Sequence, residues 1–146
     1  MELFCIPTHR EVGAALFSVM SEIAELKKFK RVETKLIILD NSTDDVYIKN
    51  EQLIANIETT IDIIHIGLDE MRKYCHKIAT KLAMSEKEVD ELLLPDSIDY
   101  GKISNWVYLV GVMHRARIIH RRDSDCFIDE KYGKMSYPIY DVKSSF

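Results

Sequence analysis

The stretch "LFCIPTHREVGAALFSVMSEIAELKKF", Leu3 to Phe29, decides the fold class. It opens with a continuous apolar run, Leu3 to Ile6, as expected of a strand that is buried on both faces and ends at Pro7. Thr8 and Glu11 have the spacing of a capping box, in which the hydroxyl and the carboxylate satisfy free amides at the start of a helix. Apolar residues then recur at helical spacing: Val12, Leu16, Val19, Met20, Ile23 and Leu26. The stretch predicts a strand, a tight turn and a helix.

The same pattern recurs along the next part of the chain. A second apolar run, Leu36 to Leu39, ends in acids and turn formers. Asp44 or Asp45 can cap a helix from about Val46 to Glu58, with Leu53, Ile54 and Ile57 facing inward. "IDIIHIG", Ile61 to Gly67, predicts a third strand. The helix after it carries one apolar face: Met71, Tyr74, Cys75, Ile78 and Leu82.

The remaining elements lead to a pair of acids. Ser85 and Glu88 repeat the capping-box spacing before a short helix that Pro95 ends. A further helix is predicted in "ISNWVYLVGVMHRA", with one apolar side: Ile103, Trp106, Val107, Val110 and Met113. A fourth strand, "ARIIH", then runs into Asp123 and Asp125.

Composition and charge narrow the class of protein. A chain of 146 residues, 47% hydrophobic and 30% charged, fits one ordinary globular domain over residues 1–146. Its net charge of -4 argues against general nucleic-acid binding, which needs a basic surface. Cys5, Cys75 and Cys126 lie far apart, as expected of reduced thiols in a cytoplasmic protein. No apolar run approaches the roughly 18 residues of a transmembrane segment.

Strands that alternate with helices predict an α/β fold, a Rossmann-like three-layer domain with a mostly parallel sheet. Ligands of such sheets bind beyond the carboxyl ends of the strands. The residues at those ends are Pro7, Thr8 and Arg10; Asp40, Asn41 and Ser42; His65 and Gly67; and Asp123 with Asp125. Polar side chains therefore collect at one edge. By itself the D-x-D pair fits either a solvated acidic turn or a cation site.

The order of these motifs resembles a known family. A Pro-Thr pair follows the first strand, and the Asp-containing turn "LDNSTDD" follows the second. In "GKISNWVYLVGVMHRARIIHRRDSD", Gly101 and Asn105 precede a helix, a strand and D-x-D. From about Leu3 to Asp125 this is similar to the nucleotide-sugar-binding half of a GT-A glycosyltransferase of the GT2-like kind. The segments "HRAR" and "HRR" depart from it, because many relatives have small or acidic residues there.

The resemblance implies a glycosyltransferase, or its donor-binding half, that binds a nucleotide-diphosphate sugar through Mn²⁺ or Mg²⁺. Asp125 would be the direct metal ligand, and Asp123 would reach the metal through water or contact the ribose. Asp40 would accept a hydrogen bond from the base or ribose. The other residues implied at the nucleotide pocket are Pro7, Thr8, Arg10, Asn41 and Asn105.

Each of these residues also has a structural interpretation. Asp123 and Asp125 can form an exposed turn, and Asp40 can form an Asx-turn. Thr8 and Asn105 can cap helices, and Arg10 can be a solvated first-turn residue. Arg121 and Arg122 are interpreted as neighbours that neutralise nearby acids, and His65 as a hydrogen-bonded structural histidine.

The segment after D-x-D limits the catalytic interpretation. Only "CFIDEKYGKMSYPIYDVKSSF" follows, and its acids, Asp129, Glu130 and Asp141, match no pattern for a catalytic base. The sheet is thus expected to be truncated after the D-x-D strand, with a short or missing acceptor part, and a homodimer or a separate partner half is possible. The alternatives are a non-catalytic α/β interaction domain with an exposed acidic turn and a nucleotidyltransferase.

Overall fold

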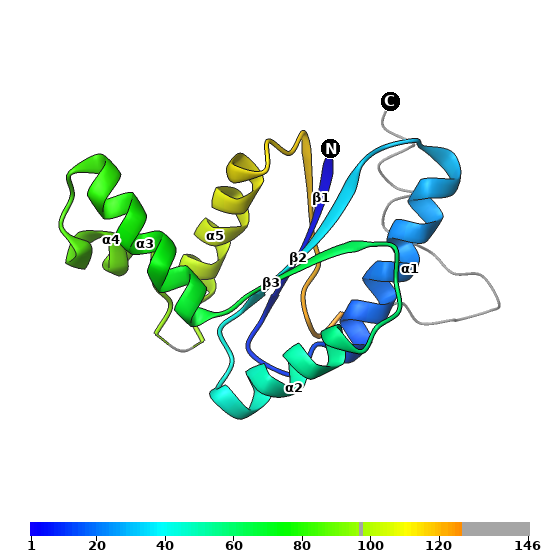
Figure 1. Ribbon diagram of the computed structural model, residues 1–146, viewed down its shortest axis with the longest axis horizontal. Coiled ribbons are helices and arrows are strands. Elements are labelled where there is room, and N and C mark those ends of the chain that lie inside the picture. Colours follow the sequence, from blue (N-terminus) through cyan, green and yellow to red (C-terminus); the bar gives the residue numbers. More distant parts are fainter. Residues whose placement is uncertain (97, 127–146) are drawn as a thin grey trace.

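A computed structural model gives the fold and describes residues 1–96 and 98–126. Within these residues, four strands form one parallel sheet in the order β3-β2-β1-β4 (Figure 1). The strands are β1 (Glu2–Thr8), β2 (Thr34–Asp40), β3 (Asp62–Ile66) and β4 (Ile118–Arg121). The helices are α1 (Gly13–Phe29), α2 (Asp44–Ala55), α3 (Leu68–Leu82), α4 (Glu86–Leu93) and α5 (Tyr100–Met113). The predicted Rossmann-like α/β fold is confirmed.

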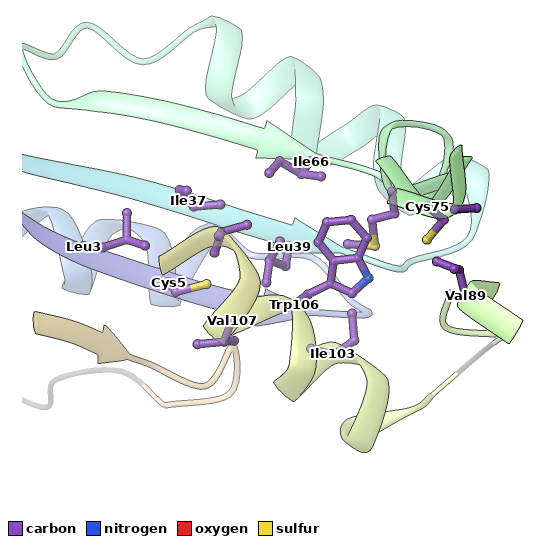
Figure 2. Packing of buried hydrophobic residues seen from close by; sticks show 13 residues of the cluster. Leu3, Cys5, Ile37, Leu39, Ile66, Cys75, Val89, Ile103, Trp106 and Val107 are labelled. Atoms are coloured by element: carbon purple, nitrogen blue, oxygen red, sulfur yellow. The ribbon is translucent and has the colours of Figure 1, made fainter. Parts of the chain in front are cut away.

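Helices cover both faces of the sheet (Figure 1). On one face α1 and α2 pack against alternate strand residues such as Phe4 and Ile38. On the other face α3, α4 and α5 pack against the residues between them, such as Leu3 and Ile37 (Figure 2). The central strands β1 and β2 are therefore buried on both sides, which explains why their apolar runs are continuous instead of alternating.

The two apolar helix faces predicted on this side of the sheet are correct except at their ends. Trp106 is fully buried, and its Nε1 donates a 2.6 Å hydrogen bond to the carbonyl of Leu93. Leu82 and Met113, however, are 63% and 41% exposed. Each is the last residue of its helix. The sequence placed both residues on the apolar faces of their helices, and these ends of the faces are exposed in the structure.

The predicted start of the first helix was wrong. β1 continues through Pro7 to Thr8, and α1 begins only at Gly13, with Val12 as its N-cap. The Thr8 hydroxyl accepts from the Arg10 N–H (3.1 Å) and donates to the Arg10 carbonyl (2.8 Å). The Thr8 hydroxyl is therefore bonded to the backbone of Arg10, which precedes the helix, and it does not cap the helix amides. Glu11 instead pairs with Lys49 at 2.7 Å.

The start of α2 lies slightly earlier than predicted. Thr43 is its N-cap, and Asp44 and Asp45 lie within its first turn, where negative charge favours the helix dipole. The helix runs from Asp44 to Ala55 instead of from Val46 to Glu58. The two acids therefore lie at the amino-terminal end of the helix, as predicted, although neither of them is the N-cap.

The capping box of α4 is confirmed and leads to a prediction. The Ser85 Oγ accepts from the Glu88 N–H at 3.2 Å, and the Glu88 carboxylate accepts from the Ser85 N–H at 3.0 Å. Replacing Ser85 by Ala leaves helix amides without a partner and should lower the free energy of unfolding by about 1 kcal/mol. Urea denaturation followed by circular dichroism measures this loss. Lys87→Ala, at an 86% exposed side chain of the same helix, should change stability much less.

Within the part of the chain that the structure describes, no helix is both long enough and apolar enough to cross a bilayer.

Candidate functional site

A pocket of about 220 Å³ lies at the carboxyl ends of the strands. From β1 the chain proceeds to β2 and β3 on one side, and it returns to β4 on the other side of β1. Parallel sheets bind ligands at such a reversal of strand order. The lining residues are Pro7, Thr8, His9, Arg10, Asn41, Ile98, Asp99, Tyr100, Ile103, Arg121, Asp123, Ser124 and Asp125.

The loop after β1 forms one wall and is held rigidly. Asn50 is a buried residue of α2, and its Nδ2 donates to the Arg10 carbonyl at 3.1 Å. Its Oδ1 accepts from the Val12 N–H at 3.0 Å. Together with the Thr8 turn, these bonds fix the backbone of residues 8–12. The guanidinium of Arg10 remains exposed at the pocket and donates to the His9 Nε2 at 3.0 Å.

Asp40 lies beneath this loop and is 1% exposed. Its carboxylate accepts from the Ser42 N–H (2.9 Å) and from Asn50 Nδ2 (2.8 Å), and it contacts His65 Nε2 at 2.9 Å. Burial raises the pKa of Asp40, but hydrogen bonds from His65, Ser42 and Asn50 outweigh it and hold that pKa below its usual value. Asp40 therefore holds the loop in place through Asn50 and does not line the pocket.

His65 is the structural histidine that the sequence indicated. Besides its bond to Asp40, its ring stacks on that of Tyr47, with centroids 4.6 Å apart. Its Nδ1 is buried and has no hydrogen-bond partner within the described residues. The Ser42 side chain lies near enough to Asp40 to contribute to its lowered pKa, yet among residues 1–96 and 98–126 no group is at hydrogen-bonding geometry to the Ser42 Oγ.

The first turn of α5 forms the opposite wall. Asp99 caps the helix by accepting from the Lys102 N–H at 3.0 Å. Tyr100 is 64% exposed, and its ring meets that of His9 edge-on at 6.2 Å between centroids. The Asp99 carboxylate itself occupies the amino end of the helix, where negative charge is favoured, and the exposed tyrosine adds apolar surface. This wall therefore presents an acid and an aromatic ring to the pocket.

The acidic turn after β4 closes the pocket. Asp123 Oδ1 accepts from Arg121 Nε at 3.2 Å, and the Cys126 N–H donates to the Asp123 carbonyl at 3.1 Å. Both carboxylates are exposed, Asp123 with 57% of its side chain accessible. Burial and the two carboxylates raise the pKa of the Cys126 thiol, so it is a poor candidate for a thiolate nucleophile.

The structure brings six of the eight sequence-derived site residues to one pocket: Pro7, Thr8, Arg10, Asn41, Asp123 and Asp125. Asp40 lies beneath it, as described above. Asn105 lies outside the lining and donates from Nδ2 to the Leu92 carbonyl at 3.1 Å, so it is not an N-cap but a residue within α5. Asp129, Glu130 and Asp141 lie outside the described residues.

The lining also contains seven residues that were not predicted as site residues: His9, Ile98, Asp99, Tyr100, Ile103, Arg121 and Ser124. His9 and Ser124 lie between predicted site residues, so their positions alone were a signal. No sequence signal indicated Asp99 and Tyr100, because the helix was expected to start at Ile103, three residues after the observed start of α5 at Tyr100. Arg121 neutralises Asp123, as interpreted, whereas Arg122 pairs with Glu22, 100 residues away in sequence.

The carboxylates at the pocket could hold a cation only with further ligands. Within residues 1–96 and 98–126, no group of three or more His, Cys, Asp or Glu side chains is placed to bind a metal ion. Mg²⁺ is commonly bound by one or two carboxylates together with substrate phosphates and water. Asp123 and Asp125 therefore fit a cation that binds with a phosphate ligand, and they do not form an all-protein metal cage.

Comparison with known proteins identifies a family but not an activity. No match was found among curated proteins or solved structures. The similarity to GT-A glycosyltransferases thus stays a prediction from the sequence. One family, described as a family of unknown function (DUF6271), matches residues 3–145, which is nearly the whole chain. The protein therefore belongs to the DUF6271 family.

Proposed function

We propose that this chain binds a nucleotide-diphosphate sugar at the pocket through Mn²⁺ or Mg²⁺ at Asp123 and Asp125, as the donor-binding part of a glycosyltransferase. The observation that carries the proposal is the meeting of these two acids with Thr8, Arg10 and Asn41 at the point where the strand order reverses. These residues come from three strand ends that are far apart in sequence.

The charges at the pocket support a role for a cation. Its lining contains three carboxylates, Asp99, Asp123 and Asp125, but only two guanidinium groups, Arg10 and Arg121. A diphosphate would be repelled by the two acids of the turn unless a divalent cation lay between them. When bound, such a cation stabilises the charge that develops on a diphosphate leaving group. Arg10, which pairs with no carboxylate in the described part of the chain, would bind and orient the phosphates.

The size of the pocket indicates which part of the donor it holds. Its volume of about 220 Å³ is below the roughly 300–1,000 Å³ of sites that enclose a whole small molecule. It therefore suits the diphosphate and part of the nucleoside. Tyr100 and Ile98, which are 64% and 59% exposed, provide apolar surface at the rim for a planar base.

The proposal predicts a thermal shift that depends on both nucleotide and metal. A nucleoside diphosphate with Mn²⁺, at about 100 times its Kd, should stabilise the folded protein by about 2.7 kcal/mol and raise Tm. UDP, GDP, ADP and CDP should each be tested with Mn²⁺ and with EDTA. Asp125→Ala should remove the metal-dependent shift while the Tm without ligand stays close to that of the wild type. Glu91→Ala, at an exposed acid on α4, is the control. A flat response to the whole panel would rule the proposal out.

A non-catalytic interaction domain is the second candidate, and exposed apolar side chains favour it. Tyr108 and Val112 lie four residues apart on α5 and are 69% and 76% exposed. Under this alternative, Asp123→Ala and Asp125→Ala leave binding behaviour and stability nearly unchanged. In either case we propose a cytoplasmic protein, because Cys5, Cys75 and Cys126 are all free thiols.

A further inference from the structure

Two consecutive arginines at the end of β4 have different environments. Arg122 donates two hydrogen bonds to the buried Glu22 carboxylate, at 2.6 and 2.8 Å, and so points to α1. Arg121 lines the pocket instead. Its Nε donates to Asp123 Oδ1 at 3.2 Å, and its Nη1 donates to the Ser104 Oγ of α5 at 2.9 Å. The Arg121 guanidinium therefore connects the α5 wall to the acidic turn.

Arg121 thus occupies a carboxylate that the proposed cation also needs. The ion pair is partly solvated, because the side chains of Arg121 and Asp123 are 39% and 57% exposed. Exposed ion pairs contribute little net free energy, so Arg121 loses little stability when it leaves Asp123 for another anionic partner. A guanidinium also binds phosphate oxygens with a planar fork of N–H donors, which gives it a second favourable partner at the same place.

We propose that Arg121 is a diphosphate-binding residue that competes with the cation for Asp123. Without ligand, Arg121 neutralises Asp123 and disfavours binding of a metal ion alone. When the cation and a diphosphate bind together, the cation takes Asp123 and Arg121 transfers its hydrogen bonds to phosphate oxygens. The inference rests on the proposed function and deepens it: the cation binds tightly only when the diphosphate binds with it.

Arg121→Gln tests this through two effects of opposite sign. Binding of Mn²⁺ alone, measured by electron paramagnetic resonance of free Mn²⁺, should become about 2–5-fold tighter because the competing guanidinium is lost. Binding of the nucleoside diphosphate that gives the largest thermal shift, measured by calorimetry at saturating Mn²⁺, should weaken about tenfold or more because a charge-assisted contact is lost. Arg121→Lys keeps the charge without the fork, so it should leave Mn²⁺ binding unchanged and weaken nucleotide binding by an intermediate factor.

Arg117→Gln is the matched control, since it removes the same charge from an exposed residue outside the pocket lining. It should alter neither binding constant by more than about twofold, because solvent screens distant charges. Weaker binding of both ligands in Arg121→Gln would mean that Arg121 only holds the turn, and it would overturn the inference. Unchanged nucleotide binding, or equal effects of Arg117→Gln, would overturn it too. If wild-type protein binds no nucleoside diphosphate, the proposed function fails, while the Mn²⁺ measurement still decides whether Arg121 competes for Asp123.

Discussion

Trp106→Ala should lower the free energy of unfolding by about 3–5 kcal/mol. The indole is fully buried between the sheet and α3 (Figure 2), so its loss leaves a cavity that the surrounding elements fill only partly. The change also removes the 2.6 Å hydrogen bond from Nε1 to the Leu93 carbonyl, which ties α5 to the end of α4. Chemical denaturation followed by far-ultraviolet circular dichroism measures the loss.

Two further variants separate packing from hydrogen bonding. Trp106→Phe keeps most of the apolar volume but not the N–H donor. Its free energy of unfolding should therefore lie between those of the wild type and Trp106→Ala. Tyr108→Ala removes an aromatic ring two residues further along α5, where the side chain is 69% exposed. It should change stability by no more than about 0.5 kcal/mol. Equal losses from Trp106→Ala and Tyr108→Ala would contradict the burial of Trp106 and the exposure of Tyr108 on α5.

Asp40→Ala should be comparably destabilising, by roughly 3–5 kcal/mol near neutral pH. The substitution deprives Ser42 N–H, Asn50 Nδ2 and His65 Nε2 of their shared partner in a site that is almost fully buried. Asp96→Ala, at a side chain that is 88% exposed, is the matched control and should be nearly neutral. A loss of similar size in both variants would show that the buried network is not the cause.

The contribution of Asp40 should depend on pH in a defined direction. Hydrogen bonds from His65, Ser42 and Asn50 hold its pKa in the folded protein below the ordinary value that an aspartate has in an unfolded chain. A lowered folded-state pKa means that the stabilisation is complete above about pH 5 and is lost as the pH falls through the two pKa values. The difference in stability between wild type and Asp40→Ala should therefore shrink below pH 4. A difference that stays constant down to pH 2 would contradict this assignment.

Asp40→Ala also bears on the pocket, because Asn50 links Asp40 to the loop of residues 8–12. The sequence resemblance implied that Asp40 contacts the nucleotide directly. In the structure its carboxylate is 1% exposed and its oxygens are occupied by protein groups. Any loss of ligand binding in Asp40→Ala is therefore expected to follow the loss of loop order.

The order of strands and helices could be predicted from the sequence because it depends on local patterns. Leu3 to Ile6 and Leu36 to Leu39 are continuous apolar runs, as central parallel strands require. The edge of the sheet at which polar residues meet could be predicted as well, because all carboxyl ends of parallel strands lie on the same side. That rule brought Thr8, Asn41 and Asp123 to one pocket.

Side-chain partners that are distant in sequence could not be predicted. Arg121 and Arg122 are adjacent and identical in type, yet one faces Asp123 at the pocket and the other faces Glu22 on α1. Asp40 and Asn50 likewise meet only because α2 packs beside the end of β2. The periodicity of a segment predicts which of its faces is apolar. It does not predict which polar group of another segment lies opposite a given side chain.

The sequence by itself determined the α/β class, the succession of elements and the edge of the sheet at which the polar residues meet, since these follow from hydrophobic periodicity and from the common direction of parallel strands. Only the tertiary structure decided the strand order β3-β2-β1-β4, the burial of Asp40, the displacement of Asn105 from the pocket and the pairing of Arg121 with Asp123. The physical reason is that burial and ion pairing depend on distances between segments, and these distances exist only once the helices have packed on both faces of the sheet.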